Sequence, residues 1–181
     1  MADAWVREVL SFWFGLASEQ WWTADPELDE RIRKRFVELW TEQRQRPADD
    51  FLSVPDTALA AVILFDQLPR NMFRGHADSF ATDHLALAIA KGAVDRGYDQ
   101  DFQQPRRAFF YMPFLHSEDF ADQQQAMLLF AALGDAHQLA YARKHHDVIE
   151  RFGRFPHRNA ILGRAPRPDE IAAGDVDRIR L

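Results

Sequence analysis

The stretch Ser53-Val54-Pro55-Asp56-Thr57-Ala58-Leu59-Ala60-Ala61-Val62-Ile63-Leu64-Phe65 decides the fold class of this sequence. It opens with a helix-start signal, because a proline in the first helical turn loses no hydrogen bond there. The run from Ala58 to Phe65 is apolar on every side, which is typical of a helix at the centre of a domain. We therefore predict a central helix that starts at this signal and that Pro69 ends.

Helix signals recur on both sides of this stretch, whereas the alternating pattern of strands is nearly absent. Further helices are predicted to begin near Asp3, Asp25-Pro26, Asp78, Gln104, Ser117, Asp135 and Arg167-Pro168-Asp169-Glu170. Pro113 and Gly134 are predicted to end two of them. The prediction is an all-α fold, a single domain of seven or eight antiparallel helices over residues 1–166, with a polar tail over residues 167–181.

Composition excludes several classes of protein. The 181 residues include 15 Phe and 5 Trp, which is too much apolar area for a disordered chain. The absence of Cys excludes disulfides, thiolate metal sites and cysteine nucleophiles. A formal net charge of −6 argues against a nucleic-acid binder. No apolar run approaches the roughly 18 residues of a membrane span, and the first residues lack signal-peptide features, so we expect a cytoplasmic protein with no membrane partner.

Three polar segments, residues 65–75, 111–119 and 151–164, each contain a proline beside a predicted helix end. In each segment, aromatic or aliphatic anchors alternate with polar side chains, an arrangement that holds polar groups in fixed directions, as a binding site requires. The polar side chains are Asp66, Arg70, Asn71 and Arg74 in the first, His116, Ser117, Glu118 and Asp119 in the second, and Arg154, His157, Arg158, Asn159 and Arg164 in the third.

These segments, together with Trp13-Phe14-Gly15, resemble the signature of a bacterial family known only as a domain of unknown function, number nine-two-four. The resemblance covers roughly Trp5 to Arg164. It implies an all-helical fold similar to tetratricopeptide-like helical hairpins, and it implies no particular activity.

The order of the helices suggests a common location for the three segments. In an up-down array, the loops after odd-numbered helices all lie at one end. The segments follow the third, fifth and seventh predicted helices, so we expect one end with a surplus of Arg over carboxylates beside helix N-termini. Such an end can bind phosphate or carboxylate. The leading hypothesis is a small anionic metabolite bound through Arg70, Asn71, Arg74, Ser117, Arg154, His157, Arg158, Asn159 and Arg164.

Whether the protein is an enzyme stays open. His116 is the candidate for proton transfer, with Glu118 beside it to tune its pKa, although a structural histidine is the alternative. Asp66, Glu118 and Asp119 are expected to pair with Arg or to cap a helix rather than to join His116 in a metal site. No metal and no cofactor are therefore expected.

The rival hypothesis is a protein-interaction module of the tetratricopeptide type, in which the Arg and Asp clusters are purely structural. A metabolite site requires a closed pocket lined by the polar segments, whereas an interaction module requires an open apolar groove away from them.

The Arg residues are expected to differ in role. We expect Asp66 to occupy Arg70, whereas Arg154 and Arg158 are the better ligand-binding candidates, because no acid lies between Gly153 and Pro168. Arg158→Ala is therefore predicted to abolish ligand binding and to leave the melting temperature nearly unchanged. The structural alternative is that Glu118 or Asp119 pairs with Arg154 or Arg158.

Overall fold

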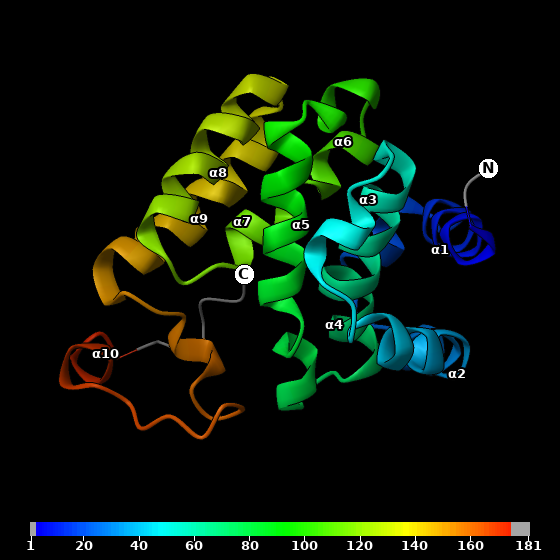
Figure 1. Cartoon of the computed structure of the whole chain (residues 1–181). Coiled ribbons are helices and arrows are strands. Elements are labelled where there is room, and N and C mark those ends of the chain that lie inside the picture. The colour runs from blue at the N-terminus through cyan, green and yellow to red at the C-terminus, as the bar shows by residue number, and fades with distance from the viewer. Residues whose placement is uncertain (1–2, 175–181) are drawn as a thin grey trace. The chain divides into compact units, whose positions relative to one another are not determined.

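The structure is a computed structural model that describes residues 3–174. Its regular elements are all helical, and the described residues contain no β-strand, which confirms the predicted fold class (Figure 1). Contacts divide the chain into two compact units, one that ends at Pro113 and one that begins at Phe114. The predicted boundary between residues 166 and 167 stays a prediction.

The first unit is built around α3. Its helices are α1 (Ala4–Phe14), α2 (Pro26–Gln43), α3 (Pro55–Val62), α4 (Leu68–Met72), α5 (Asp83–Asp95) and α6 (Arg106–Phe109), connected in part by short 3-10 turns. Every residue from Thr57 to Pro69 is buried. Because α3 packs against both α1 and α5, the predicted central helix is confirmed.

Pro69 does not end the central helix, contrary to the prediction. After Val62 the chain passes through a π-helical turn, Ile63–Gln67, directly into α4. Proline breaks an α-helix because it lacks the N–H of the regular i to i−4 hydrogen bond. The π turn, and the position of Pro69 at the start of α4, remove the need for that bond. Arg70 and Asn71 therefore lie on a helix rather than in a loop.

Pro113 likewise does not end a helix, because it lies inside α7 (Met112–His116). The predicted helix from Gln104 is instead the short α6, followed by α7. The expectation that the three polar segments share one end stays a prediction.

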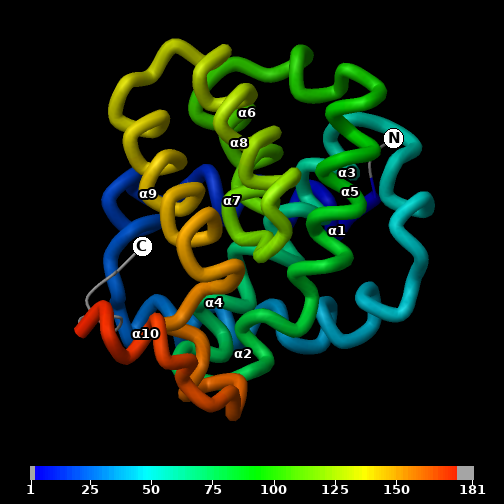
Figure 2. The backbone as a smooth tube through the Cα atoms, turned by 90° about the vertical axis from the view of Figure 1, so that its left-hand side faces the viewer, coloured from blue at the N-terminus to red at the C-terminus, as the bar shows by residue number. Residues whose placement is uncertain are grey.

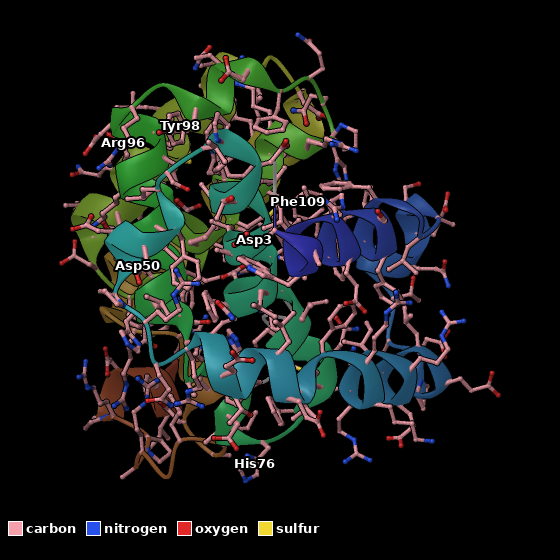
Figure 3. All side chains as sticks on the ribbon, turned by 45° about the vertical axis from the view of Figure 1, so that its right-hand side comes forward. Asp3, Asp50, His76, Arg96, Tyr98 and Phe109 are labelled. Carbon is pink, nitrogen blue, oxygen red and sulfur yellow. The ribbon has the colours of Figure 1, made fainter. Side chains whose placement is uncertain are left out.

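The helix starts follow local chemistry in most places. Asp3, labelled in Figure 3, occupies the N-cap position of α1. The Asp25 carboxylate accepts hydrogen bonds from the backbone N–H groups of Glu27 and Leu28, as predicted for the start of α2. Asp78, however, lies in a 3-10 turn, and the long helix α5 begins only at Asp83.

The second unit contains α8 (Phe120–Leu133), α9 (Ala136–Phe152) and α10 (Pro168–Ala172). Helices α8 and α9 lie side by side as a hairpin (Figure 2). Gly134 closes α8 with a φ of +76°, a conformation that favours glycine, and Asp135 caps α9, both as predicted. The predicted cap Ser117 is wrong: the Asp119 carboxylate accepts from the N–H groups at the start of α8 instead.

Candidate functional site

In the first unit, Arg70 is bound by carboxylates from two elements. Its guanidinium donates to both carboxylate oxygens of Asp83 at 2.9 and 3.0 Å. The Asp66 carboxylate, which is fully buried in the π turn, lies 3.5 Å from it. The expected pairing with Asp66 is present, but the closer partner is the first residue of α5.

Arg74 and Asn71 share a second carboxylate, Asp29 on α2. Arg74 donates to its two oxygens at 2.6 and 2.9 Å, and Asn71 donates at 2.8 Å. The hydrogen bond to Asp29 raises the pKa of Arg74 above its usual range. The polar side chains of the first segment therefore fasten α4 to α2 and α5.

In the second unit, the structure brings the second and third polar segments together. Glu118 accepts hydrogen bonds from Arg164 at 2.7 and 3.0 Å and from the backbone N–H of Phe155 at 2.7 Å. Burial raises the pKa of Glu118, but the hydrogen bonds from Arg164 and Phe155 outweigh it and hold the pKa below its usual range. Glu118 thus joins the start of α8 to the loop that follows α9.

Glu170 on α10 binds the other end of the same loop. Its side chain is 1% exposed and accepts from Arg154 at 2.6 and 2.9 Å, from Asn159 at 2.9 Å and from the Arg167 N–H at 2.7 Å. The hydrogen bond from Arg154 is the main reason that the pKa of Glu170 falls to about 2. Sequence reasoning missed this residue, although Glu three positions after Arg167 is a helix-start signal.

The contacts within each unit largely remove the predicted surplus of Arg over carboxylates, because most Arg residues of the polar segments pair with a carboxylate. Each of four Arg residues forms a two-point ion pair with one carboxylate: Arg70 with Asp83, Arg74 with Asp29, Arg154 with Glu170 and Arg164 with Glu118. Such bidentate pairs fix geometry strongly. Asp29, Asp83 and Glu170 all lie outside the three segments, so a count within the segments could not find them.

Arg158 is a buried residue of the third segment, with only 7% of its surface exposed. Its guanidinium carbon lies 4.7 Å from the centre of the Phe155 ring, and Nη2 donates to the carbonyl of His116 at 3.1 Å. The structure thus brings Arg158 to His116. The expectation that Arg158→Ala leaves the melting temperature unchanged does not fit this burial.

Three histidines of the second unit lie near one another. The rings of His116 and His145 are 6.3 Å apart, and Phe155 packs against both His145 and His157. Burial lowers the pKa of His145 to about 3 and that of His157 to about 4. Both are therefore neutral in the folded protein at neutral pH.

The remaining predicted ligand residues have contacts within the second unit. The Ser117 hydroxyl accepts from the Asp119 N–H and donates to the Asp122 carboxylate. Arg164 also donates to the Asn159 side chain at 3.0 Å. His116 as a proton-transfer residue, and these residues as ligand contacts, stay predictions.

Potential metal-ligating atoms come together elsewhere on α9. Among the described residues, His146, Asp147 and Glu150 place one ligand atom each within 4.8 Å of one another. Asp147 and Glu150 are exposed, and none of the three belongs to the polar segments.

A surface groove lies between α1 and α2, with a volume of about 640 Å³. It is open and mostly apolar, and we call it the α1–α2 groove; its lining residues are Ser11, Phe12, Gly15, Leu16, Arg31, Lys34 and Arg35. Figure 3 shows the two helices with their side chains. None of these residues belongs to the three polar segments.

The three cations of the α1–α2 groove differ in how they are held. Arg35 donates to Glu8 at 2.9 Å, and its guanidinium carbon lies 5.2 and 5.5 Å from the ring centres of Phe12 and Phe36. Lys34 lies 3.4 Å from Glu30. Arg31 makes no ion pair or side-chain hydrogen bond with the described residues.

Comparisons relate the chain to bacterial proteins of unknown function. No helix within residues 3–174 combines the length and apolar character that a membrane crossing needs. The solved structure of a protein of unknown function from Agrobacterium tumefaciens, ATU0120, matches with a TM-score of 0.88 and 40% sequence identity, over 95% of this chain and 97% of that chain. No curated protein matches this chain. Residues 9–173 match the family described as a bacterial protein of unknown function, DUF924, and the chain therefore belongs to that family.

Proposed function

We propose that this protein is an interaction module whose first unit accepts a segment of another protein in the α1–α2 groove. The observation that carries the proposal is the groove itself, which is open, mostly apolar and free of residues from the polar segments. Exposed apolar depressions with a polar rim are typical of protein interaction sites.

The pairing of the Arg residues supports this function over the binding of a small anion. Four guanidinium groups each donate two hydrogen bonds to one carboxylate of the same unit; they belong to Arg70, Arg74, Arg154 and Arg164. An incoming anion would have to displace these carboxylates. The clusters therefore serve as fasteners between helices, which is the role that the interaction hypothesis assigns to them.

A photo-crosslinking experiment in bacterial cells tests the proposal. A benzoylphenylalanine in place of Leu16 is expected to capture a partner protein, because Leu16 lines the groove. The matched control is the same substitution at Leu128, which is 67% exposed on α8 and outside the groove. The partner found at Leu16 is then purified, and its binding is expected to fail when Phe12 is changed to Asp. Equal capture at both positions, or binding insensitive to Phe12→Asp, contradicts the proposal.

A second candidate function is the binding of a small anionic metabolite in the second unit. It rests on one observation: His157 lies next to Arg158, and its Nδ1 is buried without a hydrogen-bond partner among the described residues. Arg154, Asn159, Arg164 and Ser117 would complete that site, with His116 for proton transfer if the protein is an enzyme. Three of the predicted ligand residues, Arg70, Asn71 and Arg74, belong to the first unit, and we propose no role for them outside that unit.

A thermal-shift screen with phosphate- and carboxylate-bearing metabolites tests this second candidate. A ligand at 100 times its dissociation constant stabilises a protein by about 2.7 kcal/mol, which is readily measured. His157→Ala is expected to abolish the shift, whereas the exposed His137→Ala is expected to retain it. A screen without any stabilising compound removes this candidate.

A further inference from the structure

We infer that the segment bound in the α1–α2 groove is an acidic amphipathic helix. Carboxylates of this helix pair with Arg31 and Lys34, and its apolar side chains pack against Phe12 and Leu16. The inference rests on the proposed function and adds the chemistry of the partner. It follows from the charge, the shape and the spacing of the groove residues.

The charge of the groove is opposite to that of the protein as a whole. Its lining contains three cations and no carboxylate, although the chain carries a formal net charge of −6. Glu8 and Glu30 pair with Arg35 and Lys34 at the edge of the groove, so negative charge on the partner would be complementary mainly to Arg31 and to the exposed Lys34. A long polyanion such as a nucleic acid is disfavoured, because the rest of the surface would repel it.

Two of the three cations are available to a partner. Arg31 is exposed and forms no ion pair or side-chain hydrogen bond with the described residues. Lys34 is 76% exposed, and Glu30 beside it is bound more closely by Arg33, at 2.6 Å, than by Lys34, at 3.4 Å. Arg35, held by Glu8 and stacked against Phe12, forms a fixed wall of the groove.

The apolar part of the groove comes from the end of α1. Phe12 and Leu16 lie four residues apart, and Gly15 beside them leaves bare backbone between them. A side chain at Gly15 has no room, because its Cβ would lie 2.7 Å from the Ser11 carbonyl oxygen. The apolar lining of this part of the groove favours apolar side chains on the partner.

The spacing of the cations favours a helical partner. Arg31, Lys34 and Arg35 follow helical spacing on one face of α2. Carboxylates three or four residues apart on a second helix present the same spacing. The 11 residues of α1 span about 16 Å at 1.5 Å per residue, which matches about three turns of a bound helix.

Fluorescence anisotropy with the purified full-length protein tests the inference. The probe is a labelled synthetic peptide of about 18 residues in which Leu and Glu follow helical spacing. We expect saturable binding that weakens at high salt. The double variant Arg31→Glu, Lys34→Glu is expected to bind at least tenfold more weakly. Arg143→Glu, Lys144→Glu on α9 changes the net charge equally and is expected to bind like the unchanged protein.

A charge-swapped peptide makes the test specific. The same peptide with Lys in place of Glu is expected to bind only the Arg31→Glu, Lys34→Glu variant, and a Glu peptide with Ser in place of Leu is expected to bind neither protein. Circular dichroism checks that the variants stay folded, as the exposure of both side chains implies. Equal binding of the Glu and Lys peptides to the unchanged protein overturns the inference.

The two failures are distinguishable. Loss of peptide selectivity, with crosslinking at Leu16 intact, overturns the acidic helix and leaves the proposed function standing. Absence of both peptide binding and crosslinking at Leu16 overturns the proposed function as well. Binding of dodecanoate, with no binding of the peptide, identifies a small amphiphilic anion as the occupant and overturns both.

Discussion

Glu118 and Glu170 are the residues on which the polar contacts of the second unit converge. Glu118 holds Arg164 and the Phe155 N–H, and Glu170 holds Arg154 and Asn159. An unpaired charge in a poorly solvated place costs more than the pair contributes, because desolvation is no longer offset. Removing either carboxylate is therefore expected to lower the free energy of unfolding more than removing an exposed carboxylate.

Glu118→Gln is predicted to destabilise the protein by about 1–3 kcal/mol, because it leaves the partly buried Arg164 without its counter-charge. Urea unfolding at pH 7, followed by circular dichroism, measures the change. The control Asp50→Asn breaks an exposed ion pair with Arg46 and is expected to cost less than about 0.5 kcal/mol. Equal effects of the two substitutions would show that the ion pair of Glu118 with Arg164 does not stabilise the second unit.

Arg158→Ala is predicted to cost about 2 kcal/mol, through loss of packing on Phe155 and of a charged hydrogen bond to a carbonyl. Arg158→Lys is expected to restore only part of this stability, because it lacks the planar group that stacks on the ring. The exposed Arg143→Ala serves as the control, measured in the same urea series. If Arg158→Ala retains full stability, Arg158 is again a candidate ligand residue.

At the scale of elements, the predictions from the sequence differ in success according to the range of the interactions involved. Asp25, Asp135 and Gly134 act within one helical turn, so the local sequence predicts them correctly. The effect of Pro69 depends on the hydrogen-bonding pattern around it, and no local signal marks a π turn.

Partners that are distant in sequence could not be predicted. Asp29 and Arg74 are 45 residues apart, and Arg154 and Glu170 are 16 apart. Such pairs form only when the packing of helices brings them together, so a single sequence shows the charges without their partners. The α1–α2 groove was missed for the same reason, since it needs two helices to form.

The central helix offers a test of its own. Leu64 is completely buried in the π turn, and Leu64→Ala is predicted to destabilise the protein by about 2–5 kcal/mol, because a cavity remains. Leu128→Ala, at an exposed position of α8, is expected to cost less than about 0.5 kcal/mol. Urea unfolding measures the loss of stability in both variants. An equally small loss for Leu64→Ala would mean that this segment is not the centre of the first unit.

At the scale of the whole molecule, sensitivity to acid is concentrated in the second unit. The pKa values of His145, His157 and Glu170 fall to about 3, 4 and 2, and the pKa of Glu118 is also lowered; all four groups lie in that unit. A histidine with a folded-state pKa of about 3 or 4 is neutral when folded and binds a proton near pH 6.5 when unfolded. The unfolded state therefore takes up more protons as the pH falls below 6.5.

The second unit is predicted to unfold at a higher pH than the first. His145 alone lowers the unfolding free energy by up to about 1.4 kcal/mol per pH unit between pH 6.5 and its folded-state pKa, and the two glutamates add to the loss below about pH 4.5. All five Trp lie in the first unit, so their fluorescence reports that unit alone. As the pH is lowered, we expect helix content to fall at a higher pH than the pH at which Trp fluorescence changes. The substitution His145→Phe is expected to reduce the difference between the two midpoints. Coincident transitions would contradict this.

The π turn at Ile63–Gln67 also constrains how the family can vary in length. Each residue of a helix adds about 100° of rotation and 1.5 Å of rise. The wider π turn holds one residue more than an α-helical turn over almost the same rotation and rise. Deleting one residue within Ile63–Gln67 would therefore restore a regular α-helix and leave the pairs Arg70–Asp83 and Arg74–Asp29 nearly unchanged, whereas a second deletion would rotate α4 by about 100° and separate both pairs. Related sequences should therefore tolerate the loss of one residue in this turn, and their other insertions and deletions should fall in the turns between helices.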